Sequence, residues 1–142
     1  MDSCIWLSAD KKNFDSAKEQ CTQLVSNGRL FEPKNLLEND LAVTFLLKSL
    51  QPANAWIGNI HPPNTWIGIS DLQVEGKFEY LSSGTEPTFS NWVTGQPDDH
   101  KDGEDCVHFW FDSKRWRKSV GLWNDVSCDH QYTYICEQPV TG

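Results

Sequence analysis

Five cysteines constrain the fold of this chain more than any other feature of its sequence. They are Cys4, Cys21, Cys106, Cys128 and Cys136. Five are few for a small scaffold held together mainly by disulfides, but many for a cytosolic domain of this size. No Cys-x-x-Cys pair is present, which argues against a zinc ribbon and a thioredoxin-type motif. We therefore expect an oxidising compartment with two disulfides and one leftover thiol. Cys4, at the edge of the chain, is the candidate for the leftover, and spacing alone leaves the pairings open.

Length and composition predict a single domain over residues 1–142 and argue against two classes of partner. Seven Trp, seven Phe and three Tyr supply core material, and 23% charged residues argue against disorder. A net charge of −8 and a pI near 4.8 argue against nucleic acid. No apolar run approaches the roughly 18 residues needed to span a bilayer, so no membrane insertion is expected. No apolar signal segment follows Met1-Asp2-Ser3, so a secreted form would have lost its signal peptide.

Apolar periodicity predicts two helices followed by short strands. The first helix is expected over 13–24, with Asn13 as its N-cap. The second is expected over 36–50, where Asn35 and Glu38 form a capping-box pattern. The apolar residues that define its pattern are Leu36, Leu37, Leu41, Phe45 and Leu46. Strands are expected at 65–69, 77–81, 106–111 and 132–136, with a long loop between 81 and 106. Helices first and strands afterwards predict the α+β class.

Oxygen-bearing side chains are concentrated between positions 96 and 125. The chain reads Gln-Pro-Asp-Asp-His-Lys-Asp-Gly-Glu-Asp from 96 to 105 and Trp-Asn-Asp from 123 to 125. Ca²⁺ takes about six to eight oxygens from carboxylates, amides, backbone carbonyls and waters. The residues able to supply that shell are Gln96, Asp98, Glu104, Asn124 and Asp125. The segment therefore predicts a cation site with room for an external hydroxyl. A solvated acidic loop is the alternative.

Taken together, the motifs resemble those of the C-type lectin domain almost from end to end. The residues that carry the resemblance are Cys21, Trp66-Ile67-Gly68-Ile69, Asn91-Trp92, Gln96-Pro97-Asp98, Gly103-Glu104-Asp105-Cys106, Trp123-Asn124-Asp125, Cys128 and Cys136. The resemblance implies an α+β C-type lectin fold with two helices, small antiparallel sheets and a long calcium-binding loop region. It also implies the disulfides Cys21–Cys136 and Cys106–Cys128. Cys4 matches the second cysteine of an N-terminal hairpin in longer members. Because its upstream partner is missing here, we expect a non-native thiol or a bridge to another chain in a dimer.

The same resemblance implies two calcium ions. The principal ion would be held by Gln96, Asp98, Glu104, Asn124 and Asp125, and two adjacent sugar hydroxyls would complete its shell. Pro97 would follow a cis peptide bond, which usually marks a tight turn. A second ion would be held by Asp71, Glu75, Asp99, Asp105 and the carbonyl of Glu104. The alternative is that Asp71 and Glu75 only cap the turn before Gly76.

The Gln-Pro-Asp motif implies a preference for galactose or N-acetylgalactosamine. Strong galactose binders of the family often have an aromatic residue just after the motif, where this chain has Asp99-His100. His100 and Trp116, which lies in a long interval before Asn124, are the candidates to stack on the apolar face of the sugar. The alternatives are a histidine that is exposed or supports a metal ligand, and a solvated cationic loop around Trp116.

The function that follows is a calcium-dependent glycan-binding lectin, either extracellular or in the ectodomain of a membrane protein. The alternative is a lectin-like domain that uses the same acidic surface for a protein or mineral partner. We do not expect an enzyme, because a metal-ligating carboxylate cannot readily keep the raised pKa that a glycosidase acid needs. The chain also lacks Gly-x-Ser-x-Gly, His-Glu-x-x-His and phosphate-binding glycine motifs.

Overall fold

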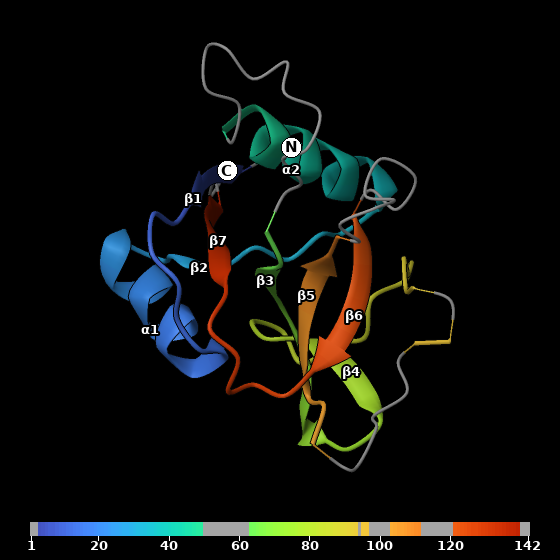
Figure 1. Ribbon diagram of the computed structural model, residues 1–142. Coiled ribbons are helices and arrows are strands. Elements are labelled where there is room, and N and C mark those ends of the chain that lie inside the picture. Colours follow the sequence, from blue (N-terminus) through green and yellow to red (C-terminus); the bar gives the residue numbers. More distant parts are fainter. Residues whose placement is uncertain (1–2, 50–62, 94, 97–102, 112–120, 140–142) are drawn as a thin grey trace.

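Figure 1 shows the computed structural model, which describes residues 3–49, 63–93, 95–96, 103–111 and 121–139. Within these ranges the chain forms two helices, α1 (Phe14–Leu24) and α2 (Leu36–Ser49). The strands are β1 (Ser3–Leu7), β2 (Arg29–Leu30), β3 (Thr65–Val74), β4 (Lys77–Tyr80), β5 (Cys106–Trp110), β6 (Leu122–Val126) and β7 (Thr133–Pro139). Both predicted helices and the four predicted strands are present, which confirms the α+β class. Neither described helix is long and apolar enough to cross a membrane.

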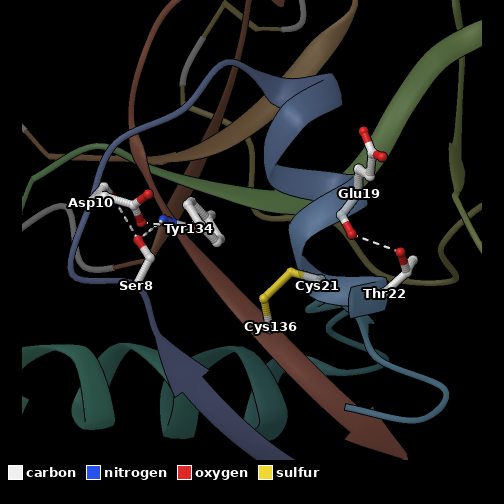
Figure 2. Close-up of a disulfide and its surroundings, with 7 residues drawn as sticks. All are labelled: Ser8, Asp10, Glu19, Cys21, Thr22, Tyr134 and Cys136. Atoms are coloured by element: carbon white, nitrogen blue, oxygen red, sulfur yellow. Dashed lines mark hydrogen bonds between the residues drawn. A yellow bond between two sulfur atoms is a disulfide. The ribbon is translucent and has the colours of Figure 1, made fainter. Parts of the chain in front are cut away.

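Helix α1 begins at the predicted cap and presents one buried face. Asn13 Oδ1 accepts a hydrogen bond from the backbone N–H of Ser16 at 2.9 Å. The helical spacing of four residues places Ala17 and Cys21 on the same buried face. From there Cys21 forms a disulfide with Cys136 of β7. Figure 2 shows this disulfide joining the helix to the strand.

Helix α2 begins with a variant of the predicted capping box. Asn35 Oδ1 accepts from the N–H of Glu38 at 2.8 Å, and the Glu38 carboxylate accepts from the N–H of Lys34 at 3.0 Å. The buried face consists of Asn39, Ala42, Val43 and Leu46. Of the predicted apolar pattern, Leu46 is buried, whereas Leu36, Leu37 and Leu41 are exposed. The pattern therefore marks the inner face only in part. Apolar residues cover most of the circumference of this helix, and periodicity therefore selects no single side.

The strands form one mixed sheet in the order β1-β7-β3-β5-β6, with β2 paired to β7 and β4 paired to β3. Among the described strands, β3 and β7 run parallel and the other pairs are antiparallel. The parallel pair makes the sheet mixed, where the sequence predicts antiparallel sheets. β1 pairs with β7 from Ser3↔Pro139 to Leu7↔Ile135, so the two ends of the described chain lie side by side (Figure 1).

Strands β1, β2 and β6 are not predicted from the sequence. β6 carries Asn124 and Asp125, and both residue types are depleted in strands. It forms because it pairs with β5 in continuous register from Cys106↔Val126 to Trp110↔Leu122. Two of the predicted metal ligands therefore lie on a regular strand and not on a loop.

Two clusters of buried side chains occupy opposite faces of the sheet. Residues 67, 69, 107, 109 and 135 of the strands pack in one cluster with Ala42, Val43 and Leu46 of α2. Residues 66, 106, 126, 134 and 136 pack in the other with Phe14, Ala17 and Cys21 of α1. Successive strand residues point to opposite faces, so each helix covers one face of the sheet.

The disulfides match both predicted pairings. Cys21 is bonded to Cys136, and Cys106 of β5 is bonded to Cys128, just after β6. Cys4 is exposed and carries no bridge, so a dimer through this residue remains a prediction.

Ser8 and Asp10, just after β1, are hydrogen-bonded to Tyr134 of β7 beside the Cys21–Cys136 disulfide (Figure 2). The hydroxyl of Tyr134 donates to the Asp10 carboxylate at 2.9 Å, and the N–H of Tyr134 donates to the hydroxyl of Ser8 at 3.0 Å. Burial, followed by the Asp10 carboxylate, raises the pKa of Tyr134 to about 12, so this hydroxyl keeps its donor hydrogen at neutral pH.

Candidate metal site

Three carboxylates, those of Asp71, Glu75 and Asp105, meet beside the β3–β4 turn. One ligand oxygen from each lies within 4.8 Å of the others. The N–H of Asp71 donates to the carbonyl of Asp105 at 3.0 Å, which holds β3 against the residue that precedes β5. The turn passes through Gly76 with φ of +83°, a conformation that glycine adopts without strain. The structure thus brings together three residues predicted for the second ion.

The cluster contains buried carboxyl oxygens with too few hydrogen-bond donors. Asp71 is 2% exposed, and its Oδ2 accepts from the N–H of Gly76 at 2.9 Å. The Oδ1 atoms of Asp71 and Asp105 are buried and have no hydrogen-bond partner among the described residues. Burial, followed by the Glu75 and Asp105 carboxyls, raises the pKa of Asp71 to about 8. Asp71 therefore does cap the turn with one oxygen, and its other oxygen is available to a cation.

The donor set of this cluster fits a hard divalent cation. Carboxylate oxygens are the ligands that Ca²⁺ prefers. A bound cation would also compensate the buried charge of Asp71, which otherwise favours the protonated form. Glu104, the predicted carbonyl ligand, adjoins Asp105 and is half-buried.

Gln96 of the predicted principal site is held close to β6 by backbone hydrogen bonds. Its N–H donates to the carbonyl of Val93 at 2.8 Å. The N–H of Val93 donates in turn to the carbonyl of Trp123 at 2.9 Å, and the N–H of Trp123 donates to the carbonyl of Asn91 at 2.8 Å. The segment from 91 to 93 therefore runs along the start of β6, the strand that carries Asn124.

The other candidates divide between described and undescribed residues. Asn124 is half-buried and Asp125 is buried in β6, and Glu104 lies two residues before β5, the partner of β6. The candidates outside the described residues are Asp98, Asp99, His100 and Trp116; the predicted cis peptide at Pro97 lies outside them as well. The complete ligand set of the principal ion therefore stays a prediction.

An amide network that the sequence analysis missed fixes the entry to β6. Asn39, buried in α2, donates from Nδ2 to the carbonyl of Gly121 at 3.0 Å and accepts from Nε1 of Trp123 at 2.9 Å. Asn91 Nδ2 donates to the same carbonyl at 2.7 Å. Gly121 has φ of +69°, and a Cβ there would lie 2.6 Å from Asn39 Nδ2. No sequence signal distinguishes Asn39 as buried, because its neighbours in the chain, Glu38 and Asp40, are both charged.

A buried histidine beside Asn124 was also missed. His108 of β5 lies opposite Asn124 in the sheet register and is 1% exposed. Asn124 Nδ2 lies 3.1 Å from His108 Nε2, and His108 Nδ1 lies 2.8 Å from the carbonyl oxygen of Phe109. Burial lowers the pKa of His108 to about 4, so the ring is neutral near pH 7. No sequence pattern marks this residue, because its partner is 16 residues away.

Comparisons with known proteins agree on one kind of domain. The family model described as "Lectin C-type domain" matches residues 10–138. A perlucin-like protein of Mytilus galloprovincialis is 32% identical over 136 residues, which cover 94% of this chain and 75% of that protein. C-type lectin 16 of Aedes aegypti is 43% identical over 76 residues, which cover 51% of this chain and 46% of the mosquito protein. The mouse scavenger receptor C-type lectin carbohydrate-recognition domain superposes with a TM-score of 0.76 at 25% identity, covering 100% of this chain and 92% of that one.

Proposed function

Because this chain belongs to the C-type lectin domain family, we propose that it is a calcium-dependent lectin for glycans that end in galactose or N-acetylgalactosamine. The family and the fold are those of carbohydrate-binding domains without catalytic activity. This confirms the predictions of a lectin and of a protein that is not an enzyme. The proposal extends to one recognition domain over residues 1–142 that works outside the cell, where its two disulfides would persist.

The carboxylate cluster of Asp71, Glu75 and Asp105 is the observation that carries the calcium dependence. Its ligand oxygens lie within 4.8 Å of one another, and two of its buried oxygens have no hydrogen-bond partner among the described residues. A cation there would neutralise the cluster and tie the β3–β4 turn to the start of β5. Glu104, a proposed ligand of the principal ion, adjoins Asp105, so this second ion would also support the sugar site.

The principal ion is assigned to Gln96, Asp98, Glu104, Asn124 and Asp125. When bound, Ca²⁺ supplies open coordination positions for two adjacent sugar hydroxyls and polarises them. The amide and carboxylate atoms of the same residues would orient those hydroxyls by hydrogen bonds. In support, backbone hydrogen bonds hold the segment before Gln96 along the start of β6, which carries Asn124 and Asp125.

The galactose preference is supported by the Gln96-Pro97-Asp98 motif and by the resemblance of this motif to galactose-type members of the family. An axial 4-hydroxyl needs a different arrangement of donors and acceptors from an equatorial one. His100 and Trp116 are proposed to stack on the apolar face of the sugar, since no aromatic residue follows the motif directly.

A glycan array probed in Ca²⁺ and in EDTA tests this function. We expect binding to terminal galactose or N-acetylgalactosamine that EDTA abolishes and free galactose competes. The double variant Gln96→Glu/Asp98→Asn exchanges the side-chain amide and the carboxylate, and we expect its preference to move toward mannose. If galactose binding survived this double change intact, the assignment of the principal site would be in error.

The net charge of −8 favours one other candidate function. A lectin-like domain of the same fold would use its acidic calcium surface to bind a protein or mineral partner. Calcium binding measured by calorimetry, with no competition by free galactose or mannose and no binding on the glycan array, would select this candidate over the first.

A further inference from the structure

We propose that His108 is a positioning residue that orients the side-chain amide of Asn124 for cation binding. Its Nε2 holds Asn124 Nδ2 at 3.1 Å, which leaves the Asn124 oxygen for the ion. This inference rests on the proposed function, because Asn124 is one of the five proposed ligands of the principal ion. His108 itself touches neither the ion nor the sugar in this scheme.

The hydrogen bonds of His108 determine which of its nitrogens carries the proton. Nδ1 lies 2.8 Å from the carbonyl oxygen of Phe109, and a carbonyl oxygen can only accept, so Nδ1 is the protonated nitrogen. In the neutral ring Nε2 is then an acceptor. Asn124 must therefore present its amino group, Nδ2, to Nε2. If the amide were turned over, Asn124 Oδ1 would face the Nε2 lone pair, which is repulsive.

The ring of His108 is held in place from several sides. It is 1% exposed, packs edge-on against Trp66 at a centroid distance of 6.0 Å and lies 4.9 Å from the ring of Tyr132. The sheet register places it between Trp66 of β3 and Asn124 of β6. Because the ring cannot turn without displacing these neighbours, it offers Asn124 one fixed acceptor. The same burial disfavours a charged ring, so Nε2 remains an acceptor.

The orientation of this amide decides whether Asn124 is a ligand at all. A side-chain amide oxygen binds Ca²⁺, whereas an NH₂ group has only donors to offer. Partners that orient a metal ligand from behind typically contribute about 10- to 100-fold to metal affinity. We expect the lower end of that range here, because Asn124 is one of several ligands.

The test compares three variants by calcium titration calorimetry and by the calcium concentration that half-saturates galactose binding. His108→Leu removes the acceptor, and we expect about tenfold weaker calcium binding at the principal site. His108→Gln keeps an acceptor oxygen, and we expect it to restore most of that affinity. His130→Leu is the matched control, because His130 is exposed and stacks on the other ring neighbour, Tyr132. We expect it to bind calcium as the wild type does.

A second measurement needs neither calcium nor sugar. Long-range ¹H–¹⁵N correlation spectra of the metal-free wild type report which nitrogen of His108 carries the proton. A proton on Nδ1 is expected, and a proton on Nε2 overturns the inference even where His108→Leu does not fold. The inference also fails if His108→Leu binds calcium like the wild type, or if His108→Gln loses as much calcium affinity as His108→Leu does. A wild type with the Nδ1-protonated ring that binds no calcium would instead refute the proposed function.

Discussion

Replacing Asp71 with asparagine is expected to stabilise the metal-free protein. It should also remove the stabilisation that calcium would give by binding at the proposed second site. The variant keeps an oxygen that can accept from the N–H of Gly76, as Asp71 Oδ2 does at 2.9 Å. Its new amino group supplies a donor near the Asp105 oxygen that has no partner among the described residues. One substitution therefore removes a buried ionisable group, keeps the hydrogen bond from Gly76 and offers a donor to the Asp105 oxygen.

The size of the effect follows from the pKa of Asp71, which burial and the Glu75 and Asp105 carboxyls raise from 3.8 to about 8. At pH 7 the cost is about 1.4 kcal/mol of folding free energy for each pH unit between the ordinary pKa of 3.8 and the working pH, so the limit is roughly 4 kcal/mol. Glu75 is exposed, and solvent screens its share of the repulsion. We therefore expect Asp71→Asn to raise the free energy of unfolding in EDTA by about 2 kcal/mol.

The pH dependence has a definite sign. Between pH 3.8 and about pH 8 the folded metal-free protein holds a proton on Asp71 that the unfolded chain has lost. The contribution of Asp71 to stability is therefore most favourable below pH 3.8, declines as the pH rises, and is fully lost above about 8. The difference between Asp71→Asn and the wild type should grow over the same window.

The assay is urea unfolding in EDTA and in 10 mM Ca²⁺ (about 10 to 100 times the Kd typical of extracellular calcium modules), at pH 5 and pH 7. Calcium at that excess would stabilise the wild type by about 1.4–2.7 kcal/mol, while the variant gains nothing from the second site. Asp15→Asn, which removes one exposed charge from α1, is the matched control. The reasoning is refuted if Asp71→Asn is no more stable than the wild type in EDTA, or if its calcium response at the second site is undiminished.

Two other substitutions test the scaffold of the site. The double variant Cys21→Ser/Cys136→Ser opens a bridge between residues 115 apart and should lose roughly 4–5 kcal/mol of unfolding free energy in chemical denaturation; an unchanged midpoint would rule out a stabilising role. Asn39→Ala removes hydrogen bonds to Gly121 and Trp123 and should cost about 2–3 kcal/mol while weakening calcium binding near β6. Calorimetry that finds calcium affinity unaltered in a folded Asn39→Ala would show that the network does not support the site.

The sequence predicts well those features that depend on neighbours in the chain. Asn13 and Asn35 are correctly identified as caps, because a cap binds an N–H three residues away. The inner face of α2 is recovered only in part, since Leu37 and Leu41 suit burial as well as Val43 and Leu46 do. What selects the inner face is the shape of the sheet beneath it.

In the candidate site, too, the sequence predicts some residues and misses those whose partners are distant in the chain. Resemblance brings Asp71, Glu75 and Asp105 together before the fold is known, and the structure places their oxygens within 4.8 Å. Asn39 and His108, which we propose support the site, escape notice because their partners are 82 to 84 and 16 residues away. Only the register of β5 with β6 and the packing of α2 reveal them.

The disulfide between α1 and β7 also determines how the domain would carry a mechanical load. β1 and β7 are antiparallel, and Ser3 lies opposite Pro139, so tension between these ends would peel the two strands apart one pair at a time. The peeling reaches Cys136, which lies opposite Trp6 and is bonded to Cys21. From there the covalent path runs through the two sulfurs and bypasses every residue from 22 to 135. A force applied through a bound glycan would strain the binding site, whereas a force applied at the two ends of the chain would bypass it.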